Sequence, residues 1–402
     1  MIKALLFDLD DTLLGNDMRV FLPAYFQAVA GHFPDLDGAS LVRHLMAGTR
    51  AMLANTDPAR PLRQVFLDNF PPAQDGRAAQ MWARFEAFYS TEFARLRVHT
   101  QPRPAARLAL EWAFAAGYRV VVATSPLFPL AAILERLNWA GADGLPFDLI
   151  THIENCRFAK PHPEYLAEIL ARLGLRPEEA LLIGNDWSDD MVPAARLGMP
   201  HYWVTEAGQA PPSDQAQPLN CGPLEAFLPW AQQALGGLEP PHPPPTSIPP
   251  LLLGHLACLL DELTDLPAAL WTRRPAAAEW SLTEVVCHLR DVDQDVNQAR
   301  VSAVLEGENP FLTGADTDPW VGERDYQAQS GPRALADFAA GRQRLYARLT
   351  ALPPEAWQRP ARHALFGPTT LAEIMGWALD HDRIHLQQVR ATLRQVHSAA
   401  QG

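Results

Sequence analysis

The chain has little cysteine and no long apolar segment. Its four cysteines are widely spaced and form no CxxC pair, which favours a reduced, cytoplasmic protein over a disulfide-bonded secreted one. We expect no secretory signal, because Met1 leads at once into a short strand-like run that ends in acidic residues. No run of about 18 uncharged apolar residues occurs, so the sequence predicts no membrane-spanning helix.

Basic residues are also in deficit. Lys and Arg total 33 against 46 Asp and Glu, which gives a formal net charge of −13. This balance argues against nucleic acid or an anionic membrane as a partner, because no basic surplus exists to neutralise phosphates. With 48% hydrophobic and 20% charged residues over 402 positions, the composition is that of a globular protein with two or three domains of about 100–200 residues each.

A proline-rich stretch divides the chain into two parts. Residues 236–250 read GGLEPPHPPPTSIPP. Such a stretch predicts a stiff, extended linker without helix or strand. It would separate an N-terminal unit, residues 1–235, from a C-terminal unit, residues 251–402.

The N-terminal unit alternates short aliphatic runs with helical segments. The runs lie at residues 2–7, 118–123, 148–152, 180–184 and 201–204. Strands separated by helices predict an α/β fold with a parallel sheet covered on both faces. Residues 15–97 show apolar spacings of three and four, which predicts a helical insertion. The sheet domain would then comprise residues 1–14 and 98–235.

The C-terminal unit shows no convincing strand and four amphipathic segments. These segments lie at residues 251–265, 281–305, 333–351 and 370–395. The second begins with a capping-box pattern, in which Ser281 is followed three residues later by Glu284. Four such helices predict an all-α four-helix bundle.

Acidic side chains follow the first aliphatic run directly. Asp8, Asp10 and Asp11 precede Thr12. At ~5 Å and an effective dielectric of ~20, each like-charge pair costs about 3 kcal/mol. A cation or a proton must offset this cost, so the cluster indicates a metal site or acid–base chemistry. A solvated acidic turn is the structural alternative.

Polar side chains also follow the later runs. Hydroxyls after the second run would hold an anion, as would a lysine at the start of a helix, whose N-terminus favours negative charge. These residues, with the acids that follow Gly184 at the end of the fourth run, are Thr124, Ser125, Lys160, Asp186, Asp189 and Asp190. Their order after successive strands points to one site at the carboxyl edge of the sheet.

Together these residues resemble the four motifs of the haloacid dehalogenase (HAD) superfamily, over roughly residues 1–230. The first pattern, DxDx[TV][LV], matches Asp8 to Leu13, and the Ser/Thr and Lys motifs match Thr124 and Lys160. The acidic motif matches GNDWSDD, with an Asn between Gly184 and Asp186. The insertion at residues 15–97 looks like the helical cap of this superfamily.

The resemblance implies a phosphomonoester hydrolase that forms an aspartyl-phosphate. Asp8 would attack phosphorus, and Asp10 would protonate the leaving group and later activate water. Thr124, Ser125 and Lys160 would bind the phosphoryl oxygens and stabilise their charge.

The same resemblance implies Mg²⁺ as the cofactor. Its ligands would be the Asp8 carboxylate, the backbone carbonyl of Asp10, and Asp186, which are oxygen ligands suited to a hard cation. Asp190 would bind through water or orient the lysine of the third motif, and Asp189 is the alternative for that part.

The implied substrate is a small phosphorylated metabolite. A metal-independent dehalogenase is the alternative within the superfamily, and the presence of Asp10 disfavours it because a departing halide needs no proton. The cap would set selectivity by closing over the site. Four arginines of the insertion would either contact a second anionic group or lie at the surface: Arg19, Arg43, Arg50 and Arg60.

Two histidines stand four residues apart near the C-terminus. The segment LDHDRIHLQQV places His381 and His385 on one face of a predicted helix, a spacing suited to joint metal ligation. An HExxH metalloprotease is rejected, because Asp382 stands where that motif has its glutamate base. His288, on the second predicted helix, is a candidate third ligand.

These histidines and the segment WSLTEVVCHL resemble the DinB-like four-helix bundles, over about residues 251–395. The resemblance implies a divalent metal bound by His288, His381 and His385, and the sequence does not choose among Zn²⁺, Ni²⁺ and Fe²⁺. Three interpretations of this unit stay open: a metal enzyme, a module for partner binding or homodimer formation, and an inert triad. A scaffold protein whose bundle recruits a partner is the non-enzymatic alternative for the whole chain.

Overall fold

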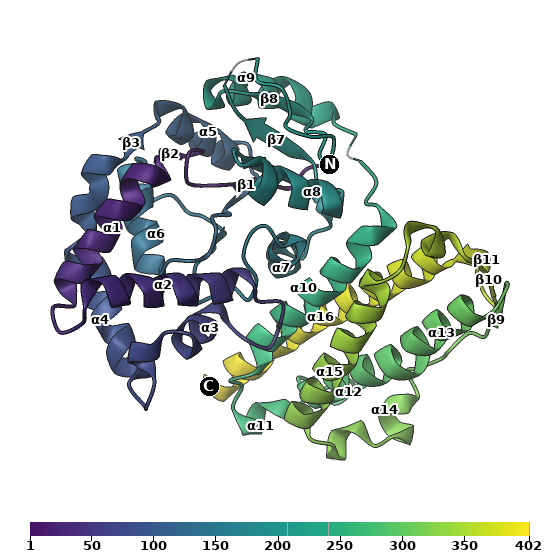
Figure 1. The fold of residues 1–402 in the computed structure, drawn as a ribbon. Coiled ribbons are helices and arrows are strands. Elements are labelled where there is room, and N and C mark those ends of the chain that lie inside the picture. The colour runs from purple at the N-terminus through teal and green to yellow at the C-terminus, as the bar shows by residue number, and fades with distance from the viewer. Residues whose placement is uncertain (207, 240, 402) are drawn as a thin grey trace. The chain divides into compact units, whose positions relative to one another are not determined.

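The computed structural model describes residues 1–206, 208–239 and 241–401 (Figure 1). Pro240 of the expected linker and Gly402, the last residue of the expected bundle unit, lie outside the described residues. The chain divides into two compact units, one comprising Met1–Leu166 with Leu175–Pro243 and the other Ala167–Gly174 with Pro244–Gly402. Among the described helices, none is long and apolar enough to span a membrane.

The first unit contains a six-stranded parallel sheet in the order β5-β4-β1-β6-β7-β8. Its central strand β1, Ala4–Phe7, is fully buried because helices cover the sheet and every residue of the strand is apolar. The other strands are β4 (Arg119–Val122), β5 (Leu149–Ile150), β6 (Ala180–Gly184), β7 (His201–Val204) and β8 (Asn220–Gly222). The α/β prediction and the five expected strands are thus confirmed. The sixth, β8, is a short edge strand of polar and small residues that carries no aliphatic signal.

Helices connect these strands. They are α5 (Pro104–Ala115), α6 (Leu130–Trp139), α7 (Pro163–Leu173), α8 (Val192–Leu197) and α9 (Leu224–Ala234), with short helical turns η3 (Pro177–Glu179), η4 (Trp187–Met191) and η5 (Leu235–Gly237). The turn η4 has π-helical geometry and begins directly after the carboxyl end of β6. It therefore carries the last acidic motif at the edge where ligands bind in such sheets.

A helical insertion follows β1. It consists of α1 (Met18–His32), α2 (Gly38–Leu53), α3 (Leu62–Asp68), η1 (Pro71–Ala73), α4 (Ala78–Thr91) and η2 (Phe93–His99). Its chain leaves and returns through an antiparallel ladder of two short strands, β2 (Leu14–Gly15) and β3 (Gln101–Pro102). Aromatic side chains form its interior; among these, Phe21, Phe33 and Phe88 are fully buried.

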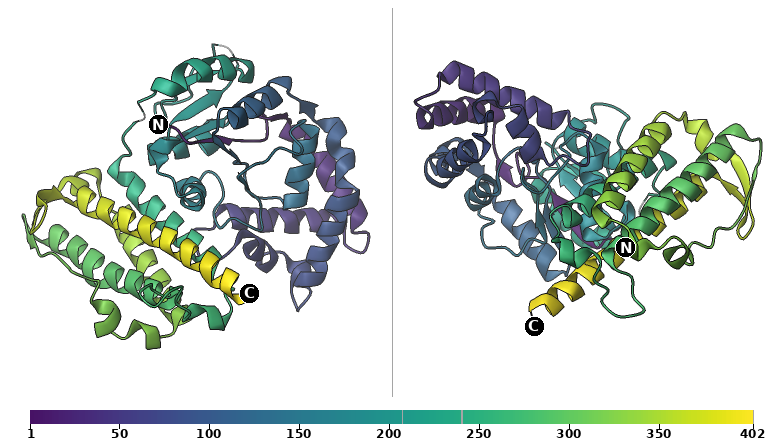
Figure 2. Two further views of the ribbon diagram at one scale, coloured as in Figure 1. Left: turned by 180° about the vertical axis from the view of Figure 1, so that it is seen from behind. Right: turned by 90° about the horizontal axis from the view of Figure 1, so that it is seen from below.

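The second unit is a bundle of long helical stretches (Figure 2). These are α10 (Ile248–Leu263), the run α12 (Leu282–Asp291), η7 (Val292–Asn297) and α13 (Gln298–Glu306), then α15 (Gly331–Thr350) and α16 (Leu371–Gln401). The expected capping box at Ser281 and Glu284 is present. Shorter elements connect the long helices: η6 (Pro245–Ser247), α11 (Ala268–Trp271), α14 (Trp320–Glu323), η8 (Tyr326–Ala328) and η9 (Pro354–Gln358).

Two local predictions in this part of the chain are wrong. The segment 236–250 was expected to hold no helix, yet α10 begins at Ile248 and includes Pro249 and Pro250. Prolines are tolerated there because the first helical turn has no intrahelical partner for its N–H groups. The unit also contains a small sheet in the order β11-β10-β9, formed by Gly367–Thr370, Pro360–His363 and Phe311–Leu312. These strands are too short for their periodicity to show in the sequence.

Candidate active site and metal centre

Three charged side chains meet at the carboxyl edge of the parallel sheet. Lys160 Nζ lies 2.6 Å from Asp8 Oδ1 and 2.6 Å from Asp190 Oδ1. All three side chains are buried, although they come from the end of β1, the loop before α7 and the turn η4. Burial alone would lower the pKa of Lys160, but the carboxylates of Asp190 and Asp8 outweigh it and raise that pKa. The lysine is therefore held as a cation between two carboxylates.

Asp190 is fixed by the backbone around it. Its Oδ2 accepts a hydrogen bond of 3.1 Å from the Asp186 amide. A Cβ atom at Gly184 would lie 2.4 Å from the same oxygen, so only glycine leaves room for this carboxylate at the end of β6. Burial raises the pKa of Asp190, and the neighbouring Asp8 adds to the shift while Lys160 opposes it.

The asparagine of the last motif lies beside Asp8. One end of the Asn185 amide is 3.2 Å from Asp8 Oδ2, 2.9 Å from the backbone oxygen of Asp10 and 3.2 Å from the Thr12 hydroxyl. If this end is the nitrogen, it donates hydrogen bonds to these oxygens. If it is the amide oxygen, it lies beside the carboxylate oxygen of Asp8 and the carbonyl oxygen of Asp10 with no hydrogen atom between them. A bound cation would then offset the repulsion among these three oxygens.

Asp186 does not take the position that the sequence predicted for it. Its side chain is exposed and accepts hydrogen bonds of 2.8 Å from the amides of Ser188 and Asp189, so it caps the turn η4. Asn185, one residue earlier, is the residue of this motif whose amide lies near Asp8. Asp189 is half-buried on the same turn, and burial together with the charge of Asp186 raises its pKa.

Asp10 is held by a cation that the sequence did not reveal. Arg136, fully buried on α6, pairs with Asp10 Oδ1, and Asn16 Nδ2 donates to the same oxygen at 2.9 Å. Asp10 Oδ2 makes no hydrogen bond within the described residues, so it is the oxygen available for proton exchange. Burial lowers the pKa of Arg136 to about 10, while Asp8 opposes this shift. An arginine within an amphipathic helix gives no sequence signal that separates it from a surface residue.

The hydroxyl motif follows β4 as predicted. Thr124 is buried, and its carbonyl accepts hydrogen bonds from the hydroxyls of Thr151, at 2.7 Å, and Tyr165, at 2.8 Å. Ser125 is half-buried, and its carbonyl accepts from the Leu127 amide at 2.8 Å. These bonds hold the backbone of the loop, so its hydroxyls and amides are preorganised to bind an anion.

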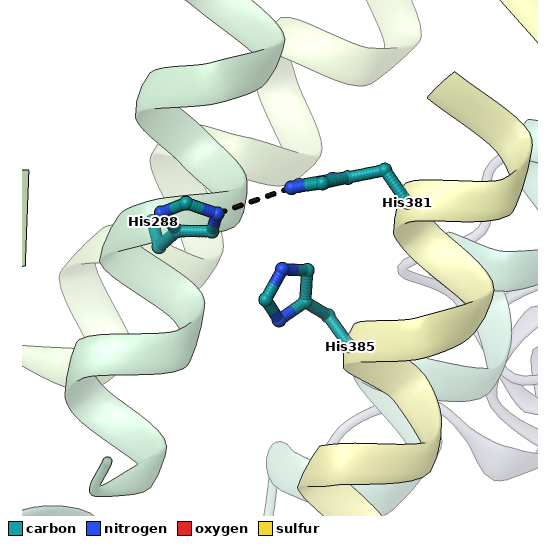
Figure 3. A group of neighbouring side chains, drawn as sticks. All are labelled: His288, His381 and His385. Carbon is teal, nitrogen blue, oxygen red and sulfur yellow. Dashed lines mark hydrogen bonds between the residues drawn. The ribbon is translucent and has the colours of Figure 1, made fainter. Parts of the chain in front are cut away.

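The three histidines of the second unit converge (Figure 3). His288 on α12 faces His381 and His385 on α16, and one ring nitrogen from each lies within 4.8 Å of the others. The Nε2 atoms of His288 and His381 are 3.1 Å apart. His385 Nδ1 lies 2.8 Å from the Gln388 side-chain oxygen, and as a donor to it this atom would leave Nε2 to face the site. The Trp280 ring is stacked on His385.

The pKa shifts of the three histidines favour the neutral form of each imidazole. Burial lowers the pKa of His288 to about 3, with His385 and His381 adding to the shift. Burial likewise lowers the pKa of His381 to about 4, helped by His385, and lowers that of His385. Neutral imidazole is the form that ligates a metal, and tetrahedral Zn–N bonds of about 2.0–2.1 Å place neighbouring nitrogens ~3.3 Å apart. The three side chains therefore fit a divalent transition metal.

A buried ion network lies next to this triad. Arg342 on α15 pairs with Asp382, the neighbour of His381 in sequence, and donates a 2.8 Å hydrogen bond to Asp293 on η7. All three side chains are almost fully buried. The network joins three parts of the bundle and fixes α16, because displacing the helix would leave buried charges unpaired.

Comparisons with known proteins agree with this geometry. The family model described as haloacid dehalogenase-like hydrolase matches residues 2–198, and the DinB superfamily model matches residues 252–389. The glyceraldehyde 3-phosphate phosphatase of Methanopyrus kandleri is 29% identical over 206 residues, 50% of this chain and 82% of the relative. The phosphoglycolate phosphatase of Aquifex aeolicus is 26% identical over 192 residues, 46% of this chain and 78% of the relative.

The uncharacterized protein YuaE of Bacillus subtilis is 23% identical over 150 residues, which are 35% of this chain and 93% of that protein. The two family models cover separate parts of the chain and account for most of it. Residues 2–198 are thus similar to the haloacid dehalogenase-like hydrolases, and residues 252–389 are similar to the DinB superfamily.

Proposed function

We propose that the first unit is a Mg²⁺-dependent phosphomonoesterase that acts on a small phosphorylated metabolite through an aspartyl-phosphate on Asp8. The observation that carries the proposal is the arrangement of polar atoms around this carboxylate. One oxygen of Asp8 accepts from Lys160, and the other lies 3.2 Å from the Asn185 amide, which also lies 2.9 Å from the Asp10 carbonyl oxygen. The phosphatase relatives named above support the same class of reaction.

The oxygen atoms near Asp8 fit Mg²⁺. In an octahedral site with bonds of about 2.0–2.1 Å, adjacent ligand oxygens lie ~2.9 Å apart. The end of the Asn185 amide is 3.2 Å from Asp8 Oδ2 and 2.9 Å from the Asp10 carbonyl oxygen, so this amide replaces Asp186 in the ligand set we propose. The bound ion would neutralise charge on the phosphoryl oxygens.

The side chains of this chain then perform the two half-reactions. Asp8 attacks phosphorus in line, and the bond from phosphorus to the leaving oxygen breaks as Asp10 Oδ2 delivers a proton to that oxygen. In the second half, Asp10 takes a proton from water, which attacks phosphorus and frees Asp8 and inorganic phosphate. Lys160 and the loop at Thr124 hold the phosphoryl oxygens, and Arg136 keeps Asp10 in position.

The test is hydrolysis of p-nitrophenyl phosphate with Mg²⁺ and with EDTA. We expect Mg²⁺-dependent release of phosphate that Asp8→Asn abolishes. Borohydride added during turnover would convert an aspartyl-phosphate at position 8 to homoserine, which peptide mass spectrometry locates. Release of halide from 2-chloropropionate without metal, or full activity of Asp10→Ala, would contradict the proposal and favour the dehalogenase alternative.

We propose that the second unit binds one divalent transition metal through His288, His381 and His385. The convergence of three imidazoles, of which His288 and His385 are buried and His381 is half-buried, supports this proposal. Three protein ligands would leave a position open, where a metal can activate water or another small ligand. Metal analysis of the full chain should find one equivalent, lost in His381→Ala but kept in the matched control His397→Ala, an exposed histidine on the same helix. Equal metal content in both variants would refute the assignment.

A further inference from the structure

An apolar cavity lies within the first unit, between the helical insertion and the loop after β4. Its volume is about 190 Å³. The insertion contributes side chains from α1 to α4, and the loop contributes Leu127 and Phe128. Within the described residues, no charged side chain lines it.

The few polar groups of this wall are already engaged. The hydroxyls of Tyr25 and Tyr89 are 2.8 Å apart and bond to each other. The Trp82 indole donates to Glu86 at 2.9 Å. Thr49 is the remaining lining residue with a hydroxyl. A polyol placed here would lose its hydrogen bonds to water and find almost no replacement, which disfavours its binding.

Two chains of contacts connect the wall of the cavity to the proposed general acid, one through Arg136 and one through Asn16. Phe128 lines the cavity, and its ring centroid lies 5.4 Å from the guanidinium of Arg136, which pairs with Asp10. Met18 also lines it, and Asn16 Nδ2 lies 3.5 Å from the Met18 sulfur and 2.9 Å from Asp10 Oδ1. Because Asp10 would protonate the leaving oxygen in the proposed reaction, this cavity is the candidate space for the leaving group.

The arginines of the insertion do not face this space. Arg19 is exposed and pairs with Asp17, Arg60 pairs with Asp68 at the surface, and Arg43 and Arg50 are exposed. None of the four lines the cavity. Of the two sequence-based interpretations, the surface one therefore holds, and the cavity offers no cation for a second anionic group.

We propose that the leaving group of the substrate is apolar: a primary alcohol that carries one aromatic ring or an alkyl group of similar size. The inference rests on the proposed phosphatase function and adds the class of substrate to it. An apolar cavity of about 150 Å³ accommodates benzene, so the larger volume here suits one ring and a short chain. We therefore expect sugar phosphates and polyol phosphates to be poor substrates.

The test compares two phosphate esters of primary alcohols, 2-phenylethyl phosphate and 2-hydroxyethyl phosphate. Their leaving oxygens are chemically similar, so the ratio of kcat/KM reports the fit of the remainder. We expect a ratio of about 10 to 100 in favour of the phenyl ester, from the burial of one ring. Acetyl phosphate, whose leaving group is small, measures the phosphoryl chemistry alone.

The three substrates distinguish failure of the proposed apolar leaving group from failure of the proposed phosphatase function. Hydrolysis of acetyl phosphate with a ratio of one or less would overturn the apolar leaving group and leave the phosphatase function intact. Failure to hydrolyse acetyl phosphate and both esters would overturn the phosphatase function, and with it this inference. The comparison uses the unaltered protein, so it does not depend on whether a variant folds.

A filling variant gives a second measurement. Leu22 lines the cavity and is half-buried, so Leu22→Trp should occupy part of the volume and lower the ratio at least about tenfold. The matched control is Leu108→Trp on α5, an exposed leucine outside the lining, which should leave the ratio unchanged. Circular dichroism melts of both variants verify folding. An unchanged ratio in folded Leu22→Trp would overturn the inference.

Discussion

Replacement of Lys160 by methionine tests the charge cluster at the sheet edge. Methionine keeps most of the volume of lysine but removes its positive charge. The ammonium is 3% exposed and lies 2.6 Å from a carboxylate oxygen of both Asp8 and Asp190. Without it, two buried carboxylates face each other with no compensating cation.

The magnitude follows from this burial. Removing one partner of a buried ion pair costs about 3–5 kcal/mol. Proton uptake by Asp190, whose pKa burial already raises, relieves part of the repulsion, so we take the lower end, about 3 kcal/mol. For a unit of this size, about 2–4 °C of melting temperature corresponds to each kcal/mol, so Tm of the first unit should fall by about 6–12 °C.

Lys160→Met should also lower kcat. Loss of one preorganised charge at a reacting group costs about 10²–10³ in kcat. Mg²⁺ should also raise Tm more in Lys160→Met than in the parent protein, because the variant has one positive charge fewer to balance its acids. Differential scanning calorimetry with and without Mg²⁺, and phosphate release from p-nitrophenyl phosphate, measure these effects.

The chain provides its own control for this substitution. Lys3 and Lys160 are its two lysines, and Lys3 is a surface residue that pairs with Glu179. Lys3→Met should change stability by less than about 1 kcal/mol and leave kcat unchanged. If Lys160→Met melts within ~2 °C of the parent, by the same scaling, the buried three-charge cluster is wrong. Parental kcat in the same variant would remove the lysine from catalysis.

Three other substitutions test neighbouring parts of the structure. Gly184→Ala should displace the Asp190 carboxylate and lower kcat/KM at least about tenfold, while an unchanged value would show that the strand end tolerates a Cβ. Arg136→Met should lower kcat with little change in KM, because Arg136 positions Asp10 rather than binding phosphate; an effect confined to KM in steady-state kinetics would contradict this role. Arg342→Met should destabilise the second unit by about 3–5 kcal/mol in urea unfolding, and a midpoint unchanged from the parent would mean that the buried network contributes nothing.

Much of the fold was predictable because its signals are local. Aliphatic runs bounded by helical segments define the central strands, and parallel strands necessarily bring their carboxyl ends to one edge of the sheet. Asp8, Lys160 and Asp190 follow from that rule together with the motif order. The bundle was predictable for a similar reason, since its helices are long and amphipathic and begin at recognisable caps.

The features of the site that the sequence did not predict depend on the direction of side chains and on contacts between elements that are distant in sequence. Whether Asn185 or Asp186 faces Asp8 depends on the backbone angles after β6, which composition does not set. Arg136 pairs with Asp10 across 126 positions of sequence, and no local pattern marks it. The cavity was missed for the same reason. Its walls come from several helices, and the periodicity of the sequence does not determine how these helices pack.

The ladder between β2 and β3 has a mechanical consequence. Leu14 pairs with Pro102 and Gly15 with Gln101, so both strands that tether the helical insertion to the sheet domain run side by side. The covalent connections therefore lie at one place, while non-covalent contacts elsewhere, such as the 2.9 Å hydrogen bond from the Leu62 amide to the Cys156 carbonyl, hold the insertion against the sheet domain. Rotation of the insertion to admit an alcohol would separate aromatic pairs that join the two parts, such as Phe93 with Trp139 and Tyr25 with Phe128.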